Sequence, residues 1–142
     1  IITTQDWHID PGVHFSDQPD YQDTWPAHGV AGTDEADLHP ELSQISGKIN
    51  YSVKKGMFEA AYSGFEGSDG EESLKQILAR ESVASVDIIG LAFDHCVKAT
   101  AIDSAQAGFK TRVLSKLTAA VSPANTDVVS DEMRSHGIEV IK

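Results

Sequence analysis

The pattern of apolar and polar positions divides the chain into two parts. After about residue 48, short runs rich in β-branched residues alternate with amphipathic stretches. Leu74, Ile77 and Leu78 recur on one face of a predicted helix. Residues 86–92 are largely apolar, which is typical of a strand buried on both faces of a parallel sheet. The predicted strands are 48–55, 86–92, 111–117 and 138–141, and the predicted helices are 71–81, 96–107 and 122–136.

This alternation of strands and helices predicts an α/β fold with an open parallel sheet covered by helices. Residues 6–41 differ, because they show little periodicity, are interrupted by proline and glycine, and hold four of the six histidines. A loop of more than thirty residues is uncommon in a compact domain unless it has a function. In open parallel sheets, ligands bind beyond the carboxyl ends of the strands, and Cys96 follows such an end.

Composition narrows the classes of molecule with which the chain is expected to interact. The chain has 142 residues, the size of a single domain, and 11 basic against 22 acidic side chains give a formal net charge of −11. We expect no nucleic-acid binding from so acidic a chain, and no membrane span, since no apolar run approaches 18 residues. The single cysteine excludes an intramolecular disulfide and suits a reducing compartment, so we expect a cytoplasmic protein.

Cys96 is the first candidate for chemistry. It lies between the apolar run 86–92 and the predicted helix, where unpaired backbone N–H groups stabilise a thiolate and can hold an oxyanion. On position alone, a small buried hydrophobic residue is the commoner outcome for a single cysteine. A nucleophile also needs a base and a charged partner.

The histidine-rich loop is the second candidate. Asp6 and His8 lie on one side of an extended segment, His14 follows a tight Asp-Pro-Gly turn, and His28 lies in a proline-flanked loop. One carboxylate and three imidazoles can bind Zn²⁺, Fe²⁺ or Mn²⁺ with positions left for water or a ligand. The alternative is a set of scattered polar loop residues. His39 and His136 are predicted to be surface residues without a role.

These residues occur in motifs that resemble one family. The motifs are DWHIDPGVHFS at 6–16, WPAH at 25–28, KG at 55–56, YSGFEG at 62–67 and DHC at 94–96. In this order they resemble the nicotinamidase/pyrazinamidase family of isochorismatase-like cysteine hydrolases, over essentially the whole chain. The resemblance implies a three-layer α/β/α sandwich with a parallel sheet. It also implies one domain over residues 1–142, with 6–45 as a metal-binding loop region.

The resemblance also implies an activity. Nicotinamide or pyrazinamide would be the small-molecule substrate, and nicotinamide would be hydrolysed to nicotinate and ammonia through a cysteine thioester, a reaction of NAD salvage. A divalent Zn, Fe or Mn ion would position the substrate through the pyridine nitrogen. No oligomeric state is predicted. The implied metal ligands are Asp6, His8, His14 and His28; the catalytic residues are Cys96 and Lys55; the oxyanion donors are Ala92 and Cys96; the substrate-binding residues are Trp25, Tyr62 and His95; and the Leu91–Ala92 peptide is cis.

Several points depart from the family pattern or qualify it. The family's catalytic base is an Asp at the end of a first strand, which a helix follows. A strand–helix–strand unit needs about 30 residues, whereas only five precede Asp6. We therefore expect this N-terminal strand, helix and catalytic Asp to lie outside the chain, and Ile1-Ile2-Thr3-Thr4 to be the tail of a strand. Asp94 is not expected to replace the base, Lys54 is expected to be solvated, and Gly29 is expected to loosen the pocket wall.

Other functions remain open on the residues alone. Another amidohydrolase of the superfamily would act on a carbamoyl or ureido substrate, although the Asp6/His8/His14/His28 set argues against it. A metal-dependent hydrolase or oxidoreductase would use no covalent step, for example with a metal-bound water as the nucleophile. A non-catalytic metal- or ligand-binding remnant is the alternative from a different class.

Overall fold

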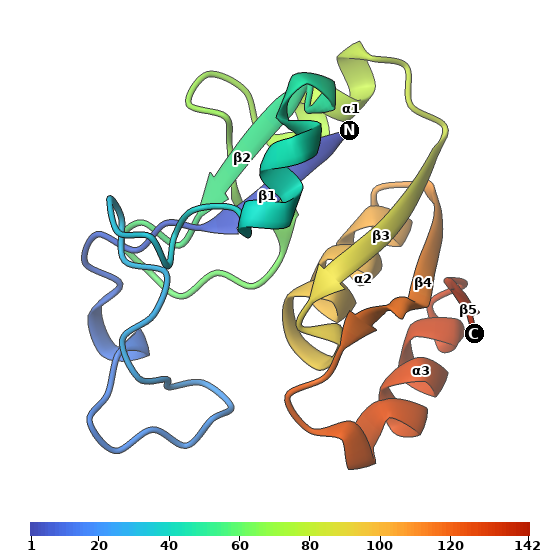
Figure 1. Ribbon diagram of the computed structural model, residues 1–142. Helices are drawn as coiled ribbons and strands as arrows, with labels where there is room; N and C mark the ends of the chain where they lie inside the picture. Colours follow the sequence, from blue (N-terminus) through green and yellow to red (C-terminus); the bar gives the residue numbers. More distant parts are fainter. The chain divides into compact units, whose positions relative to one another are not determined.

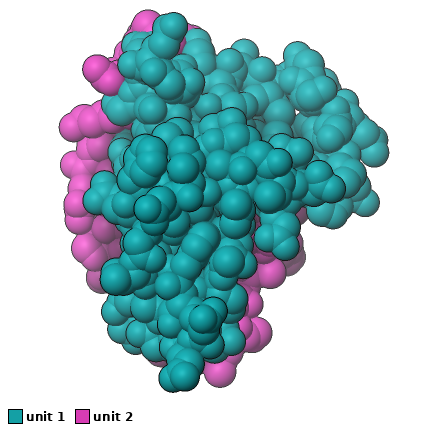
Figure 2. Space-filling model, turned by 90° about the vertical axis from the view of Figure 1, so that its left-hand side faces the viewer, with its two compact units in different colours: residues 1–74 teal, residues 75–142 magenta.

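The computed structural model describes residues 1–142, which divide into two compact units, residues 1–74 (unit 1) and 75–142 (unit 2) (Figure 2). Every strand pair in either unit is parallel and helices alternate with strands, so the predicted α/β class is confirmed. The strands form two separate sheets, one in each unit. None of the helices has the length and apolar character that a bilayer crossing requires.

Unit 1 is built on two parallel strands, β1 (Ile2–Asp6) and β2 (Tyr51–Lys55), which lie side by side in Figure 1. They pair in register from Ile2 opposite Tyr51 to Asp6 opposite Lys55. The segment between them contains two 3-10 helices, η1 (Gly12–His14) and η2 (Pro40–Lys48). The strand predicted at 48–55 starts too early, because η2 continues to Lys48.

Unit 2 is a parallel three-stranded sheet in the order β3-β4-β5, with helices between successive strands (Figure 1). The helix α1 (Leu74–Arg80) begins at the boundary between the units. The later elements are β3 (Ser85–Leu91), α2 (Lys98–Gln106), β4 (Lys110–Ala119), α3 (Thr126–Ser135) and β5 (Glu139–Ile141). Their common core consists of Ile88, Phe93, Val97, Ala101, Val113, Val129, Met133 and Ile138.

The strand β3 is buried on one face, so the expectation of burial on both faces is wrong. Ile88 lies in the core, whereas Ile89 is 55% exposed and Leu91 is 73% exposed. Since side chains alternate along a strand, only the face that carries Ile88 packs under α2 and α3. A long apolar run indicates a strand, but it does not show which of its faces a neighbour covers.

The helix predicted from residue 96 starts earlier than expected. A π-helical turn, η4 (Phe93–Val97), leads directly into α2, and the N–H of Val97 donates to the carbonyl of Ala92 over 3.0 Å. Cys96 is thus half-buried inside the first helical turn after β3. The start of the last predicted helix is likewise a 3-10 turn, η5 (Pro123–Asn125), which precedes α3.

Candidate active site

Three predicted histidines converge in unit 1. His8 follows β1, His14 ends η1, and His28 lies in the loop that passes beside His8. Their ligand nitrogens all lie within 4.8 Å of one another. His8 and His14 are buried, and His28 is half-buried. The structure therefore brings together three side chains that are spread over 21 positions of an irregular segment.

The backbone sets the protonated nitrogen of each imidazole. In all three rings Nδ1 lies within hydrogen-bond distance of a main-chain carbonyl oxygen, and a carbonyl can only accept, so each Nδ1 carries the proton. This leaves the Nε2 lone pairs available. Nε2 of His8 is buried and has no hydrogen-bond partner. The three pairs are His8 with Gly56 (2.6 Å), His14 with Asp23 (3.2 Å) and His28 with Pro26 (2.8 Å).

The chemistry of this cluster fits a divalent metal ion. Burial is the largest influence on His8 and His14, and it lowers the pKa of both below 6.5. Both rings are therefore neutral near pH 7, which is the form that binds metals. A metal ion would also satisfy the buried Nε2 of His8, which is otherwise a costly unpaired polar atom.

Main-chain hydrogen bonds hold the loops that carry the histidines. The N–H of His8 donates to the Gly29 carbonyl over 2.9 Å, and the His8 carbonyl accepts from the N–H of Ala31 over 2.8 Å. A Cβ at position 29 would lie 2.8 Å from the Cβ of Asp6. Gly29 therefore permits close packing beside β1, whereas it was expected to loosen the pocket wall.

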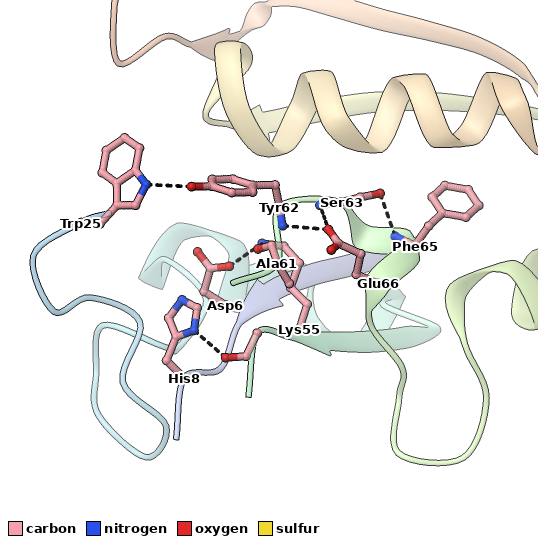
Figure 3. A network of polar contacts seen from close by, with 10 residues as sticks. Asp6, His8, Trp25, Lys55, Ala61, Tyr62, Ser63, Phe65 and Glu66 are labelled. Atoms are coloured by element: carbon pink, nitrogen blue, oxygen red, sulfur yellow. Dashed lines mark hydrogen bonds and ion pairs between the residues drawn. The ribbon is translucent and has the colours of Figure 1, made fainter. Parts of the chain in front are cut away.

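Lys55 and Asp6 form an ion pair at the ends of β1 and β2. The ammonium of Lys55 donates to Oδ1 of Asp6 and, over 2.9 Å, to the carbonyl of Ala61 (Figure 3). Lys55 is 3% exposed. Asp6 is not a member of the three-histidine group, and one of its oxygens is engaged by Lys55. Its role as a fourth ligand stays a prediction.

Lys54 points to the other side of β2 and is not simply solvated. Its ammonium lies 3.2 Å from the centre of the Trp7 ring, a cation–π contact. Because residues alternate along a strand, the register that buries Lys55 beside Asp6 turns Lys54 and Trp7 to the opposite face. The two adjacent lysines therefore have different environments.

Two of the predicted substrate-binding residues adjoin the cluster. The indole N–H of Trp25 donates to the hydroxyl of Tyr62 over 3.0 Å (Figure 3). The ring of Tyr62 meets that of His14 edge-on at 5.8 Å, and the ring of Trp25 lies 6.4 Å from that of His28. The cluster in unit 1 thus has an aromatic side.

Glu66 holds the Tyr62 segment, a role that was not predicted from the sequence. Oε2 of Glu66 accepts from the N–H groups of Tyr62 (2.9 Å) and Ser63 (2.7 Å), while the Ser63 hydroxyl accepts from the N–H of Phe65 (Figure 3). This is a capping box at the start of η3 (Gly64–Glu66). The S-x-x-E spacing of Ser63 and Glu66 is the signal that could have revealed it.

Unit 2 carries the remaining predicted residues at the end of β3. Cys96 and His95 lie in the turn η4, and the Leu91–Ala92 peptide bond is cis. Both carboxylate oxygens of Asp94 accept backbone N–H groups, from Val121 (2.9 Å) and Ser122 (2.8 Å). Burial raises the pKa of Asp94, but these hydrogen bonds outweigh it, and the net shift is downward. Asp94 therefore joins η4 to the segment that follows β4.

Comparison with known proteins adds the family. The isochorismatase domain matches residues 3–142. The chain belongs to the isochorismatase family. Within it, the chain is 45% identical over 142 residues to the nicotinamidase/pyrazinamidase of Mycobacterium tuberculosis, covering 99% of this chain and 75% of that protein. The family membership implied by the sequence motifs is confirmed.

Two solved structures share the fold of this chain. PnC1 from L. infantum, in complex with nicotinate, is 32% identical with a TM-score of 0.85, and the match covers 99% of this chain and 70% of that one. The pyrazinamidase of Pyrococcus horikoshii, in complex with zinc, is 30% identical with a TM-score of 0.77, and the match covers 99% and 74%.

Proposed function

We propose that this member of the isochorismatase family is a nicotinamidase/pyrazinamidase, which hydrolyses nicotinamide to nicotinate and ammonia. The observation that supports this most directly is the cluster of three converging imidazoles with an aromatic side. The 45% identity to a nicotinamidase/pyrazinamidase supports the same reaction. A small, neutral amide also suits a chain with a net charge of −11, which would repel anionic substrates.

The covalent step is assigned to Cys96. Its thiol proton passes to a carboxylate general base, and Sγ forms a bond to the carboxamide carbon. The carbon–nitrogen bond then breaks, and the nitrogen leaves as ammonia after receiving that proton. Water attacks the resulting thioester, which releases nicotinate and restores the thiol. Lys55 is assigned the role of a buried positive charge that favours the anionic groups of the reaction.

Stabilisation of the oxyanion of the tetrahedral intermediate is assigned to the backbone N–H groups of Ala92 and Cys96. Both residues belong to the connection between β3 and α2, and N–H groups at the start of a helix can stabilise developing negative charge. A preorganised donor of this kind contributes about 3 kcal/mol to transition-state stabilisation.

Binding of the substrate's pyridine ring is assigned to the histidine cluster and the residues around it. His8, His14 and His28 would hold a divalent zinc, iron or manganese ion, with Asp6 as a proposed fourth ligand. When bound, such an ion supplies a Lewis acid for the pyridine nitrogen. Trp25, Tyr62 and His95 would border the ring, which restricts the carboxamide to the orientation that Cys96 requires.

Replacement of Cys96 tests the proposal. In full-length protein that includes the expected catalytic Asp, we expect Cys96→Ala to abolish ammonia release from nicotinamide while the metal content stays at the wild-type level. Mass spectrometry of wild-type protein quenched during turnover should detect a nicotinoyl adduct on Cys96. Retained turnover in Cys96→Ala would instead assign the reaction to a water nucleophile, and wild-type protein that binds metal but releases no ammonia would leave a binding function.

A further inference from the structure

The turn at residues 20–24 is built around one exposed carboxylate. Oδ1 of Asp20 accepts the backbone N–H groups of Gln22, Asp23 and Thr24, each over 2.9 Å. The N–H of Asp20 in turn donates to the Thr24 hydroxyl over 2.9 Å. Tyr21 has a φ of +57°, which is unusual for a residue with a side chain, so the turn holds a backbone conformation that would not persist unaided.

The carbonyl groups of this turn hold two residues of the proposed site. The carbonyl of Asp23 accepts from Nδ1 of His14 over 3.2 Å, and that of Gln22 accepts from the hydroxyl of Tyr62 over 2.8 Å. The same Tyr62 hydroxyl accepts from the Trp25 indole. The peptide groups that Asp20 fixes through their N–H atoms are therefore those whose carbonyls orient a histidine and the aromatic side.

We propose that Asp20 is a positioning residue of the histidine cluster, which acts through the backbone of residues 22–24 to orient His14 and Tyr62. Asp20 makes no hydrogen bond to any of the three imidazoles. The inference rests on the proposed function in that it treats His14 as a metal ligand. Backbone N–H groups lower the pKa of Asp20 well below its usual range, so the carboxylate is charged at any ordinary assay pH.

The chain contains a matched control for this carboxylate. Oδ1 of Asp69 accepts the N–H groups of Glu71 (3.0 Å) and Glu72 (2.8 Å) in another exposed turn of unit 1. Asp69 lies outside the 20–24 turn and outside the three-histidine group. Asp69→Ala therefore removes the same kind of hydrogen bonds without touching the support of His14.

Cobalt binding measures the proposed effect directly. Co²⁺ is titrated into metal-free protein and followed by its visible absorption, with a competing chelator to fix the affinity. We expect Asp20→Ala to weaken Co²⁺ binding by about 10-fold or more, the usual effect of removing support behind a ligand, and to alter the absorption bands. Asp20→Asn retains an acceptor oxygen and should restore most of the affinity, whereas Asp69→Ala should bind Co²⁺ like the wild type.

Several outcomes would overturn the inference. One is wild-type affinity in Asp20→Ala, and another is an equal loss in Asp20→Ala and Asp69→Ala, which would indicate general loosening of unit 1. Absence of Co²⁺ binding to the wild type would overturn it as well. Denaturation of the metal-free variants establishes that they are folded. If Co²⁺ binding depends on Asp20 but nicotinamide is not hydrolysed, this inference stands and the proposed function fails.

Discussion

Alanine at position 56 should disturb the histidine cluster through His8. Gly56 has a φ of +73°, and a Cβ there would lie 2.5 Å from Cε1 and 2.8 Å from Nδ1 of His8. Carbon contacts this short are not tolerated, so the imidazole has to move away from β2. Its hydrogen bond to the Gly56 carbonyl, now 2.6 Å, would stretch or break, and the lone pair of Nε2 would turn away from the cluster.

Two contributions set the size of the effect. A left-handed backbone costs an L-residue about 1 kcal/mol relative to glycine. Displacing a buried imidazole from its only acceptor costs about 1–3 kcal/mol more. Gly56→Ala should therefore lower the free energy of unfolding by about 2–4 kcal/mol. Metal affinity should fall by about 10- to 100-fold, since the bond that orients a ligand is lost.

Gly32→Ala separates backbone strain from the contact with His8. Gly32 also has a positive φ, +80°, but a Cβ there would meet no atom within 4 Å. Urea denaturation without metal and a chelator competition titration are carried out on both variants. Only Gly56→Ala should lose metal affinity, and its loss of stability should be the larger. Equal metal affinities in the two variants would refute the argument that Gly56 acts by leaving room for the His8 ring.

Three further predictions concern neighbouring features. Asp94→Ala removes the acceptor of two backbone N–H groups and should lower the free energy of unfolding by about 2–4 kcal/mol in urea. The folded-state pKa of Asp94 lies below 3.8, so the stabilisation by its carboxylate is present above that value and is lost as the pH falls through the folded-state pKa. The unfolding free energies of the wild type and Asp94→Ala should therefore converge in acid. A difference between them that does not change with pH would contradict this. Glu66→Ala should destabilise the protein by about 1–2 kcal/mol, and Glu66→Gln, which keeps an acceptor, by less; equal losses would argue against the capping box. Zn²⁺ at 100 times its dissociation constant should raise the free energy of unfolding by about 2.7 kcal/mol, and His8→Ala should abolish most of that gain; an undiminished gain would place the ion elsewhere.

The sequence pattern predicted the strand and helix order well, because the deciding signals are local. The apolar runs of β3 and β4 and the prolines and glycines that bound the helices are visible without tertiary contacts. The pattern failed where tertiary contacts decide the burial of a residue or the bounds of an element. It could not show that Ile89 and Leu91 face away from the core, or that a 3-10 helix continues to Lys48.

In the candidate site, too, local signals were predictable from the sequence and tertiary contacts were not. The motifs identified His8, His14 and His28, and the structure brings these three together. Their hydrogen bonds to the carbonyls of Gly56, Asp23 and Pro26 leave no signal in a sequence, since any residue has a carbonyl. The same holds for the pairing of Lys55 with Asp6, which depends on the register of two strands 49 positions apart.

A site that is oriented by main-chain carbonyls responds to substitution in an uneven way. The side chains of Asp23 and Pro26 do not hold the imidazoles, so a change there reaches the cluster only by altering the backbone. Positions that shape the surroundings of the rings matter more, although their side chains bind no metal ion. Gly56 leaves room for the His8 ring by having no Cβ, and Asp20 fixes peptide groups by accepting three N–H groups. The sensitive positions of this loop are therefore those that fix the direction of a peptide group, and they include an exposed aspartate that burial alone would class as dispensable.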